Sequence, residues 1–244
     1  MNLSTEENLM YTVMNAIYDS GIPISFKGSM VLRACLMETG YSEDIRHTVD
    51  IDANWNDNES PTGEGMVESL QKALSQKGLN LNVSLYRMYG QGRSAGFELS
   101  DRDSGEVYFT MDIDVNRPVP PTKIYEVAGV RFCGVAPIQM IADKVAAVST
   151  DRVFRRIKDV IDLYYFSQVF PFDRASVLET LNNSGKELGS FHCFMHRREE
   201  LRHAYEKFRF SGNISKPPFR VVLETVDDYI RDVLPRNKDR EFGR

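Results

Sequence analysis

Two short segments alternate aspartate with apolar residues, and this alternation constrains the fold more than any other feature of the sequence. The segments are Val49-Asp50-Ile51-Asp52-Ala53 and Met111-Asp112-Ile113-Asp114-Val115. Residues i and i+2 of a β-strand point to the same face, so each segment would bury its apolar residues and place two carboxylates side by side. The alternation therefore predicts two strands of a sheet, each with one acidic face.

Adjacent carboxylates repel each other, and a hard divalent cation is the partner that most easily holds them together. Their oxygen atoms favour magnesium or manganese. Four acidic residues on two neighbouring strands would form the carboxylate side of a site for metal-assisted phosphoryl or nucleotidyl transfer. The alternative is a solvent-facing strand edge in which Asp and Ile alternate without a ligand.

A second feature, Gly28-Ser29, follows the short apolar run Ile22–Phe26 and precedes the apolar segment Met30–Leu36. We interpret this order as a strand, a tight turn and a buried helix. A glycine at such a turn lets the backbone approach a phosphate, and the N–H groups at the start of a helix carry partial positive charge. An ordinary turn and helix cap is the alternative, and proximity to the paired aspartates favours the phosphate site.

The rest of the chain predicts an α/β or α+β protein with a helical C-terminal domain. Ser4 and Glu7 have capping-box spacing at the start of a helix, and Leu79–Cys133 has the period-two pattern of strands. We place the core in residues 1–134 and the helical domain in residues 135–244, where Pro137 opens the first helix. Further helices are predicted at Val67–Leu74, Val153–Phe166, Ala175–Leu181, Phe191–Phe208 and Phe219–Leu234.

The charge balance limits the kinds of ligand that the protein could bind. Thirty Lys and Arg against 35 Asp and Glu give a net charge of −5, which argues against a protein coated in positive charge to wrap long nucleic acid. A local basic groove remains allowed. The densest basic cluster is Arg152, Arg155, Arg156 and Lys158, which could bind a triphosphate, bind an RNA backbone or form a solvated helix face.

The cysteines and the N-terminal residues predict a cytoplasmic protein. Cys35, Cys133 and Cys193 are odd in number and widely spaced, which disfavours a secreted disulfide framework. Residues 1–8 have neither a basic nor an apolar signal region, and no stretch approaches the roughly 20 apolar residues of a membrane span. We expect a protein that is neither exported nor embedded in a membrane.

Several of these segments together resemble the nucleotidyltransferase fold in its AbiEii/AbiGii toxin family. The resemblance runs from Phe26 to Phe166, and its two helical motifs narrow the choice of family. The matching segments are Phe26-Lys27-Gly28-Ser29-Met30-Val31-Leu32, Arg46-His47-Thr48-Val49-Asp50-Ile51-Asp52, Ile113-Asp114-Val115-Asn116, Ile141-Ala142-Asp143-Lys144-Val145-Ala146-Ala147 and Arg156-Ile157-Lys158-Asp159-Val160-Ile161-Asp162-Leu163-Tyr164-Tyr165.

The resemblance implies a nucleotidyltransferase-like mixed-sheet core, a divalent metal, an NTP donor, tRNA as the acceptor and a cognate antitoxin. Asp114 fits the third carboxylate better than Asp112 because Asn116 follows it. Many family members have Gly-Gly-Thr-Ala where this chain has Gly-Ser-Met-Val, so the preferred nucleotide stays open. The implied roles are nucleotide binding by Lys27, Gly28, Ser29 and Lys144, metal binding by Asp50, Asp52 and Asp114, and catalysis by Asp50, Asp52, Asp114, Lys144 and Asp159.

The leading hypothesis is a magnesium-dependent or manganese-dependent nucleotidyltransferase that moves a nucleoside monophosphate from an NTP to tRNA, as the toxin of a toxin–antitoxin or phage-defence system. One alternative is the same chemistry on a small molecule such as an antibiotic. Another is a catalytically silent protein that binds a nucleotide or a partner. For Lys144, which lies in an otherwise apolar helix face, the alternative to a phosphate-binding role is an ammonium group that extends to solvent.

Overall fold

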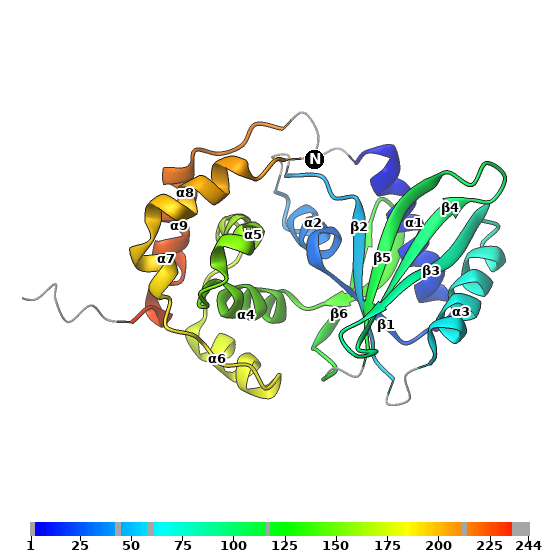
Figure 1. Cartoon of the computed structure of the whole chain (residues 1–244), viewed down its shortest axis with the longest axis horizontal. Helices are drawn as coiled ribbons and strands as arrows, with labels where there is room; N and C mark the ends of the chain where they lie inside the picture. Colours follow the sequence, from blue (N-terminus) through cyan, green and yellow to red (C-terminus); the bar gives the residue numbers. More distant parts are fainter. Residues whose placement is uncertain (1–2, 42–44, 58–60, 116–117, 211–213, 236–244) are drawn as a thin grey trace, which may run out of the picture. The chain divides into compact units, whose positions relative to one another are not determined.

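The computed structural model describes residues 3–41, 45–57, 61–115, 118–210 and 214–235 (Figure 1). Contacts within the chain separate two compact units. Of the described residues, the first unit comprises 3–137 together with Ile214 and holds seven strands, and the second comprises 138–210 and 215–235 and is helical. Within the described residues, no helix combines the length and hydropathy needed to cross a bilayer.

A single mixed sheet organises the first unit, as the family resemblance implies, and both alternating segments lie in its strands. Its strand order is β3-β4-β5-β2-β1-β7-β6. Neighbouring strands are parallel in the pairs β2–β5 and β1–β7 and antiparallel in the other pairs. The strands are β1 Ile24–Lys27, β2 Asp50–Trp55, β3 Leu81–Tyr89, β4 Ser94–Asp101, β5 Val107–Asp114, β6 Thr122–Val127 and β7 Val130–Val135.

Three helices pack on this sheet: α1 Thr5–Asp19, α2 Gly28–Glu38 and α3 Gly63–Gln76. The predicted capping box is present, because Glu7 N donates to Ser4 Oγ at 3.1 Å and Ser4 N donates to Glu7 Oε2 at 2.9 Å. Helices α1 and α3 lie on the same side of the sheet (Figure 1).

Aromatic side chains form the core beneath β1. The ring of Phe132 lies 6.0 Å from that of Phe26, 5.5 Å from that of Tyr125 and 5.7 Å from that of Tyr11. All four side chains are almost fully buried. This cluster fixes β1, and β1 in turn fixes the turn at Gly28.

The second unit is helical, and three helices predicted as continuous are divided. Residues 153–166 form a 3₁₀ turn and then a helix that starts at Ile157, because Arg156 has φ −113° and ψ 25°. Arg197 divides the predicted helix 191–208, and Ile230 ends the helix predicted to reach Leu234. The elements are α4 Pro137–Val148, η1 Val153–Arg155, α5 Ile157–Ser167, α6 Arg174–Asn183, α7 His192–His196, α8 Arg198–Lys207, α9 Phe219–Tyr229 and η2 Arg231–Val233.

Candidate active site

The two aspartate-bearing strands lie side by side. Strands β2 and β5 pair in parallel, with Asp52 opposite Asp112 and Asn54 opposite Asp114. The intervening side chains of Ile51 and Ile113 are fully buried, whereas the aspartates keep partial or full exposure. The sheet therefore presents one acidic face beside its buried face.

Gly28 lies directly against this acidic face. It starts helix α2 with φ +72°, a left-handed conformation that favours glycine. A Cβ atom at this position would lie 3.2 Å from both Cβ and Cγ of Asp52 and would come closer still to Oδ2. The strand-to-helix turn thus needs glycine both for its backbone and for the space that Asp52 occupies.

Lys27, immediately before this turn, contacts the third predicted carboxylate. Its Nζ donates to Asp114 Oδ2 at 2.6 Å and to Asn54 Oδ1 at 2.8 Å. The other carboxylate oxygen of Asp114 accepts a hydrogen bond from Ser94 Oγ. Asn54 and Ser94 carry no motif that singles them out in the sequence, although Asn54 continues the alternation that starts at Asp50. Asn116, which favoured Asp114 over Asp112, lies outside the described residues.

Side chains from the segment before β2 donate hydrogen bonds to residues of the candidate site. Arg46 Nη2 donates to Ser29 Oγ at 2.8 Å, so a guanidinium lies at the first turn of helix α2. Thr48 Oγ1 donates to Asp50 Oδ1 at 2.5 Å. Ser29 and Asp50, both predicted site residues, are therefore oriented by Arg46 and Thr48, whose roles the sequence does not predict.

The acidic face carries oxygen atoms of the kind that bind a divalent metal. Within the part of the chain that the structure describes, no three acidic, His or Cys side chains are already gathered closely enough to hold a metal ion. Magnesium is commonly held by one or two carboxylates together with substrate phosphates and water. Asp52 would offer such an oxygen ligand beside Gly28, and Asp50 would offer a second one two residues earlier on the same strand.

Lys144 belongs to a buried ion network in the second unit. Only 8% of Lys144 is exposed, and its Nζ lies 2.6 Å from Asp162 Oδ2 and 3.4 Å from Asp159 Oδ1. The alternative in which Lys144 extends to solvent is therefore wrong. Asp159 also accepts a hydrogen bond of 2.6 Å from Arg156 Nε, so two cations and two carboxylates join helices α4 and α5.

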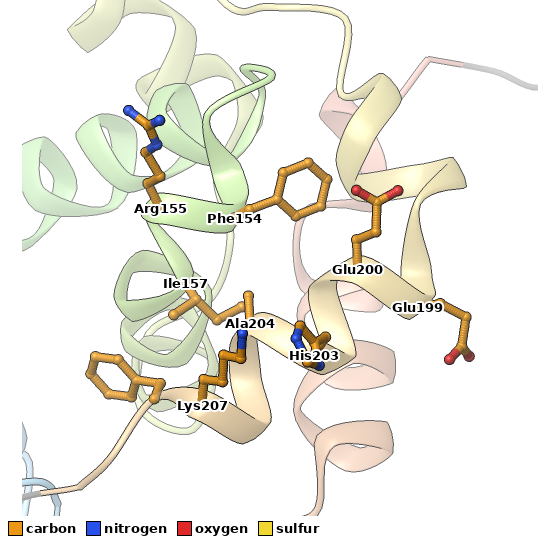
Figure 2. Close-up of a pocket in the computed structure, with 9 residues that line it drawn as sticks. Phe154, Arg155, Ile157, Glu199, Glu200, His203, Ala204 and Lys207 are labelled. Atoms are coloured by element: carbon orange, nitrogen blue, oxygen red, sulfur yellow. The ribbon is translucent and has the colours of Figure 1, made fainter.

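The four residues of the predicted basic cluster differ in exposure and in their ion pairs. Arg156 pairs with Asp159, Arg152 and Arg155 are exposed, and Lys158 is partly buried. Arg155 lines a cavity of about 730 Å³ within the second unit. Figure 2 shows Phe154 and Arg155 on one side of this cavity and side chains of helix α8 on the other. The remaining lining residues are Ile157, Glu199, Glu200, His203, Ala204, Lys207 and Phe208.

Comparison with known proteins extends the resemblance over most of the chain. The family described as "Nucleotidyl transferase AbiEii toxin, Type IV TA system" matches residues 12–230. The structure is similar to that of MenT4, a nucleotidyltransferase toxin from Mycobacterium tuberculosis H37Rv, with 16% identity and a TM-score of 0.53, over 96% of this chain and 87% of that chain. No curated protein matches the sequence. The first of these matches shows that the chain belongs to the AbiEii family of nucleotidyltransferase toxins of type IV toxin–antitoxin systems.

Proposed function

We propose that this nucleotidyltransferase transfers a nucleoside monophosphate from a metal-bound NTP to tRNA, with Asp50, Asp52 and Asp114 as its catalytic carboxylates. The observation that carries the proposal is the close approach of Gly28 to Asp52. A helix N-terminus that binds phosphates and a carboxylate that binds metal are the two parts that nucleotidyl transfer needs side by side.

The donor would bind with its phosphates at the start of helix α2. The N–H groups of Gly28 and Ser29 carry the positive end of the helix dipole, and Arg46 adds a full charge beside Ser29. Asp50 and Asp52 would hold magnesium or manganese, which when bound neutralises phosphate charge. Lys27, whose Nζ contacts Asp114 and Asn54, would supply a further cation for the triphosphate.

The transfer step would use Asp114 as the base. The acceptor hydroxyl oxygen attacks the α-phosphorus of the NTP, and its proton passes to a carboxylate oxygen of Asp114. The bond from that phosphorus to the bridging oxygen of pyrophosphate breaks, and pyrophosphate leaves with the electron pair. Contacts from Lys27 and Ser94 fix the orientation of the Asp114 carboxylate.

Residues of the second unit would serve the same reaction. The sequence motifs around Lys144 and Asp159 support roles for these two residues with the triphosphate. Their ion network supports the idea that Asp159 and Asp162 orient the Lys144 ammonium group. Arg152, Arg155, Arg156 and Lys158 are proposed as phosphate contacts for the RNA acceptor.

The toxin family supports two further expectations. An antitoxin should act against this protein in the cell, since the family description includes the whole toxin–antitoxin system. We also expect the protein to work in the reducing cytoplasm, because all three cysteines are free and two of them are buried.

Label transfer from each NTP into purified tRNA, total RNA, small molecules and protein tests the proposal, with Asp52→Asn as the inactive control. Incorporation into tRNA that requires magnesium or manganese and disappears in Asp52→Asn is the expected result. Labelling of a small molecule would instead support an antibiotic-type enzyme. Absence of labelling in every fraction would support a silent binding protein and contradict the proposal.

A further inference from the structure

Strand β3 carries two exposed tyrosines and an arginine beside the acidic face. We call Tyr86, Arg87 and Tyr89 the aromatic platform. Pairing between β3 and β4 shifts register between Leu85 and Arg87, which is a β-bulge. A bulge re-aims side chains, and here Tyr86 and Arg87 both reach Asp112: Tyr86 Oη lies 3.4 Å from Oδ1, and Arg87 Nη2 lies 3.4 Å from Oδ2.

The platform is held together by cation–π contacts. Arg87 Cζ lies 4.8 Å from the centre of the Tyr86 ring and 4.7 Å from that of Tyr89. The two tyrosines nevertheless remain 39% and 37% exposed. The platform therefore offers open aromatic surface next to a fixed positive charge.

Gly96 leaves open the space that the Tyr86 ring occupies. It lies on β4 opposite Arg87, and a Cβ atom at this position would come within 2.7 Å of Cε1 and Cζ of the Tyr86 ring. Any other residue at 96 would displace the ring. The fold thus makes room for Tyr86 on the acidic face.

Both hydroxyl groups remain protonated at neutral pH. Burial and the charge of Asp112 raise the pKa of Tyr86, and burial, Asp112 and Asp114 raise the pKa of Tyr89. Arg87 is therefore the one charged member of the platform. Neutral rings with a guanidinium are the combination on which nucleic-acid bases stack.

The strand order separates the platform from the proposed donor site. Gly28 and Ser29 follow β1 on one side of β2, whereas β5, β4 and β3 succeed one another on the other side. Asp52 on β2 and Asp114 on β5 lie between the platform and Gly28. A group that attacks a donor phosphate held at Gly28 would therefore approach from the side of the platform.

We infer that Tyr86, Arg87 and Tyr89 stack on the terminal base of a single-stranded RNA end and so position its hydroxyl for attack. This inference rests on the proposed nucleotidyl transfer and adds the residues that would select a nucleic-acid acceptor. Stacking does not depend on base identity, because every base has a π-face. The platform would therefore recognise an unpaired end and tolerate different sequences.

The test uses the full chain and a short single-stranded RNA with a free terminal hydroxyl. Fluorescence anisotropy measures RNA binding, calorimetry measures NTP binding, and melting temperature checks the fold. Tyr86→Leu with Tyr89→Leu should weaken RNA binding by roughly ten- to a hundredfold, whereas Tyr86→Phe with Tyr89→Phe should stay within about twofold. NTP binding should not change.

Tyr108→Leu is the matched control. Tyr108 lies on β5, is 42% exposed and has its hydroxyl 3.4 Å from a carboxylate oxygen of Asp101, but it does not belong to the platform. This variant should bind RNA as the wild type does. Equal losses in Tyr108→Leu and in the double Leu variant would overturn the inference.

A second set of measurements removes the terminal nucleobase of the RNA instead of the tyrosine rings. An RNA whose last nucleotide is abasic should bind wild type as weakly as the intact RNA binds the double Leu variant, with no further loss when both changes are combined. Independent losses, or an equal loss of NTP binding, would contradict acceptor stacking. If Tyr89→Leu is the only Leu variant that folds, the same comparison applies to it.

The outcomes separate this inference from the proposed function. Base-dependent RNA binding by the platform without any label transfer would support the inference while the transfer reaction fails. Label transfer to RNA with an unchanged KM for RNA in the Leu variants would retain the reaction and overturn the platform.

Discussion

Asp52 occupies the space that a side chain on Gly28 would fill, so the turn and the carboxylate depend on each other. The dependence explains why the helix can begin directly beside an acidic strand. It also makes Gly28 the most informative position to change.

Gly28→Ala should reduce both stability and activity. The left-handed φ of +72° costs a non-glycine residue about 1–2 kcal/mol, and the added methyl group also displaces Asp52. Urea unfolding and label transfer measure the two effects. Gly21→Ala is the control, since Gly21 has φ +74° with no atom within 4 Å of a Cβ. It should lose similar stability and keep full activity; equal activity in both variants would refute the role of Gly28.

Asp52→Asn should abolish nucleotidyl transfer, by about a hundredfold or more, while the fold survives. The change removes a metal ligand and also removes carboxylate repulsion beside Asp112, so the melting temperature of the metal-free protein should not fall. Substantial turnover in Asp52→Asn would exclude Asp52 from catalysis. A marked fall in melting temperature would indicate a structural role.

Comparison of Asp114→Asn with Asp112→Asn should identify the third carboxylate. Asp114 contacts Lys27 and Ser94 next to Gly28, whereas Asp112 contacts the platform. We expect Asp114→Asn to lower kcat by about a hundredfold and Asp112→Asn to raise the KM for RNA with a smaller change in kcat. Steady-state kinetics with tRNA and NTP distinguishes the two; the reverse pattern would make Asp112 the base.

Lys144→Met should destabilise the second unit by about 3–5 kcal/mol, because it leaves Asp159 and Asp162 buried without the ammonium group. Denaturant unfolding measures the loss, and adding Asp162→Asn should recover part of it. Lys186→Met is the control, since Lys186 forms an exposed ion pair with Asp143 of the same helix α4 and should cost less than about 1 kcal/mol. Equal costs would contradict the buried network.

Arg155→Ala with Arg156→Ala should lower tRNA affinity and make its salt dependence shallower, by roughly one unit of slope per lost phosphate contact. NTP binding without RNA should change less. Arg220→Ala, which removes an exposed pair with Glu224, is the control and should leave both unchanged. Equal losses of NTP and RNA binding would assign the arginines to the donor.

Period-two alternation was sufficient to predict the acidic strands, because burial of Ile51 and Ile113 leaves the aspartates no other face. The breaks in the helices could not be predicted in this way. Val153, Ile157 and Val160 are all buried at spacings of four and three residues, so the apolar pattern continues through the turn at Arg156. Periodicity reports which face is buried and does not report where the backbone hydrogen bonds change.

The sequence also could not predict which side chains the site residues contact. Lys27 meets Asp114 because β1 and β5 flank β2, and this strand order depends on tertiary packing. The bulge that turns Tyr86 toward Asp112 involves residues with no unusual local preference. Sequence patterns identified the charged residues, and only the fold determines which of them meet.

The carboxylate of Asp114 is held by Ser94, 20 residues earlier in the chain, and by Lys27, 87 residues earlier. The Ser94 contact lies in the antiparallel pair of β4 with β5. The Lys27 contact also requires the parallel pairing of β2 with β5, a non-local contact of the kind that forms slowly. A nascent chain that carries the first aspartate segment already has Lys27 but still lacks Ser94 and Asp114. If Asp114 is the base, as proposed, catalysis can begin only after β5 has been synthesised and has paired with β2.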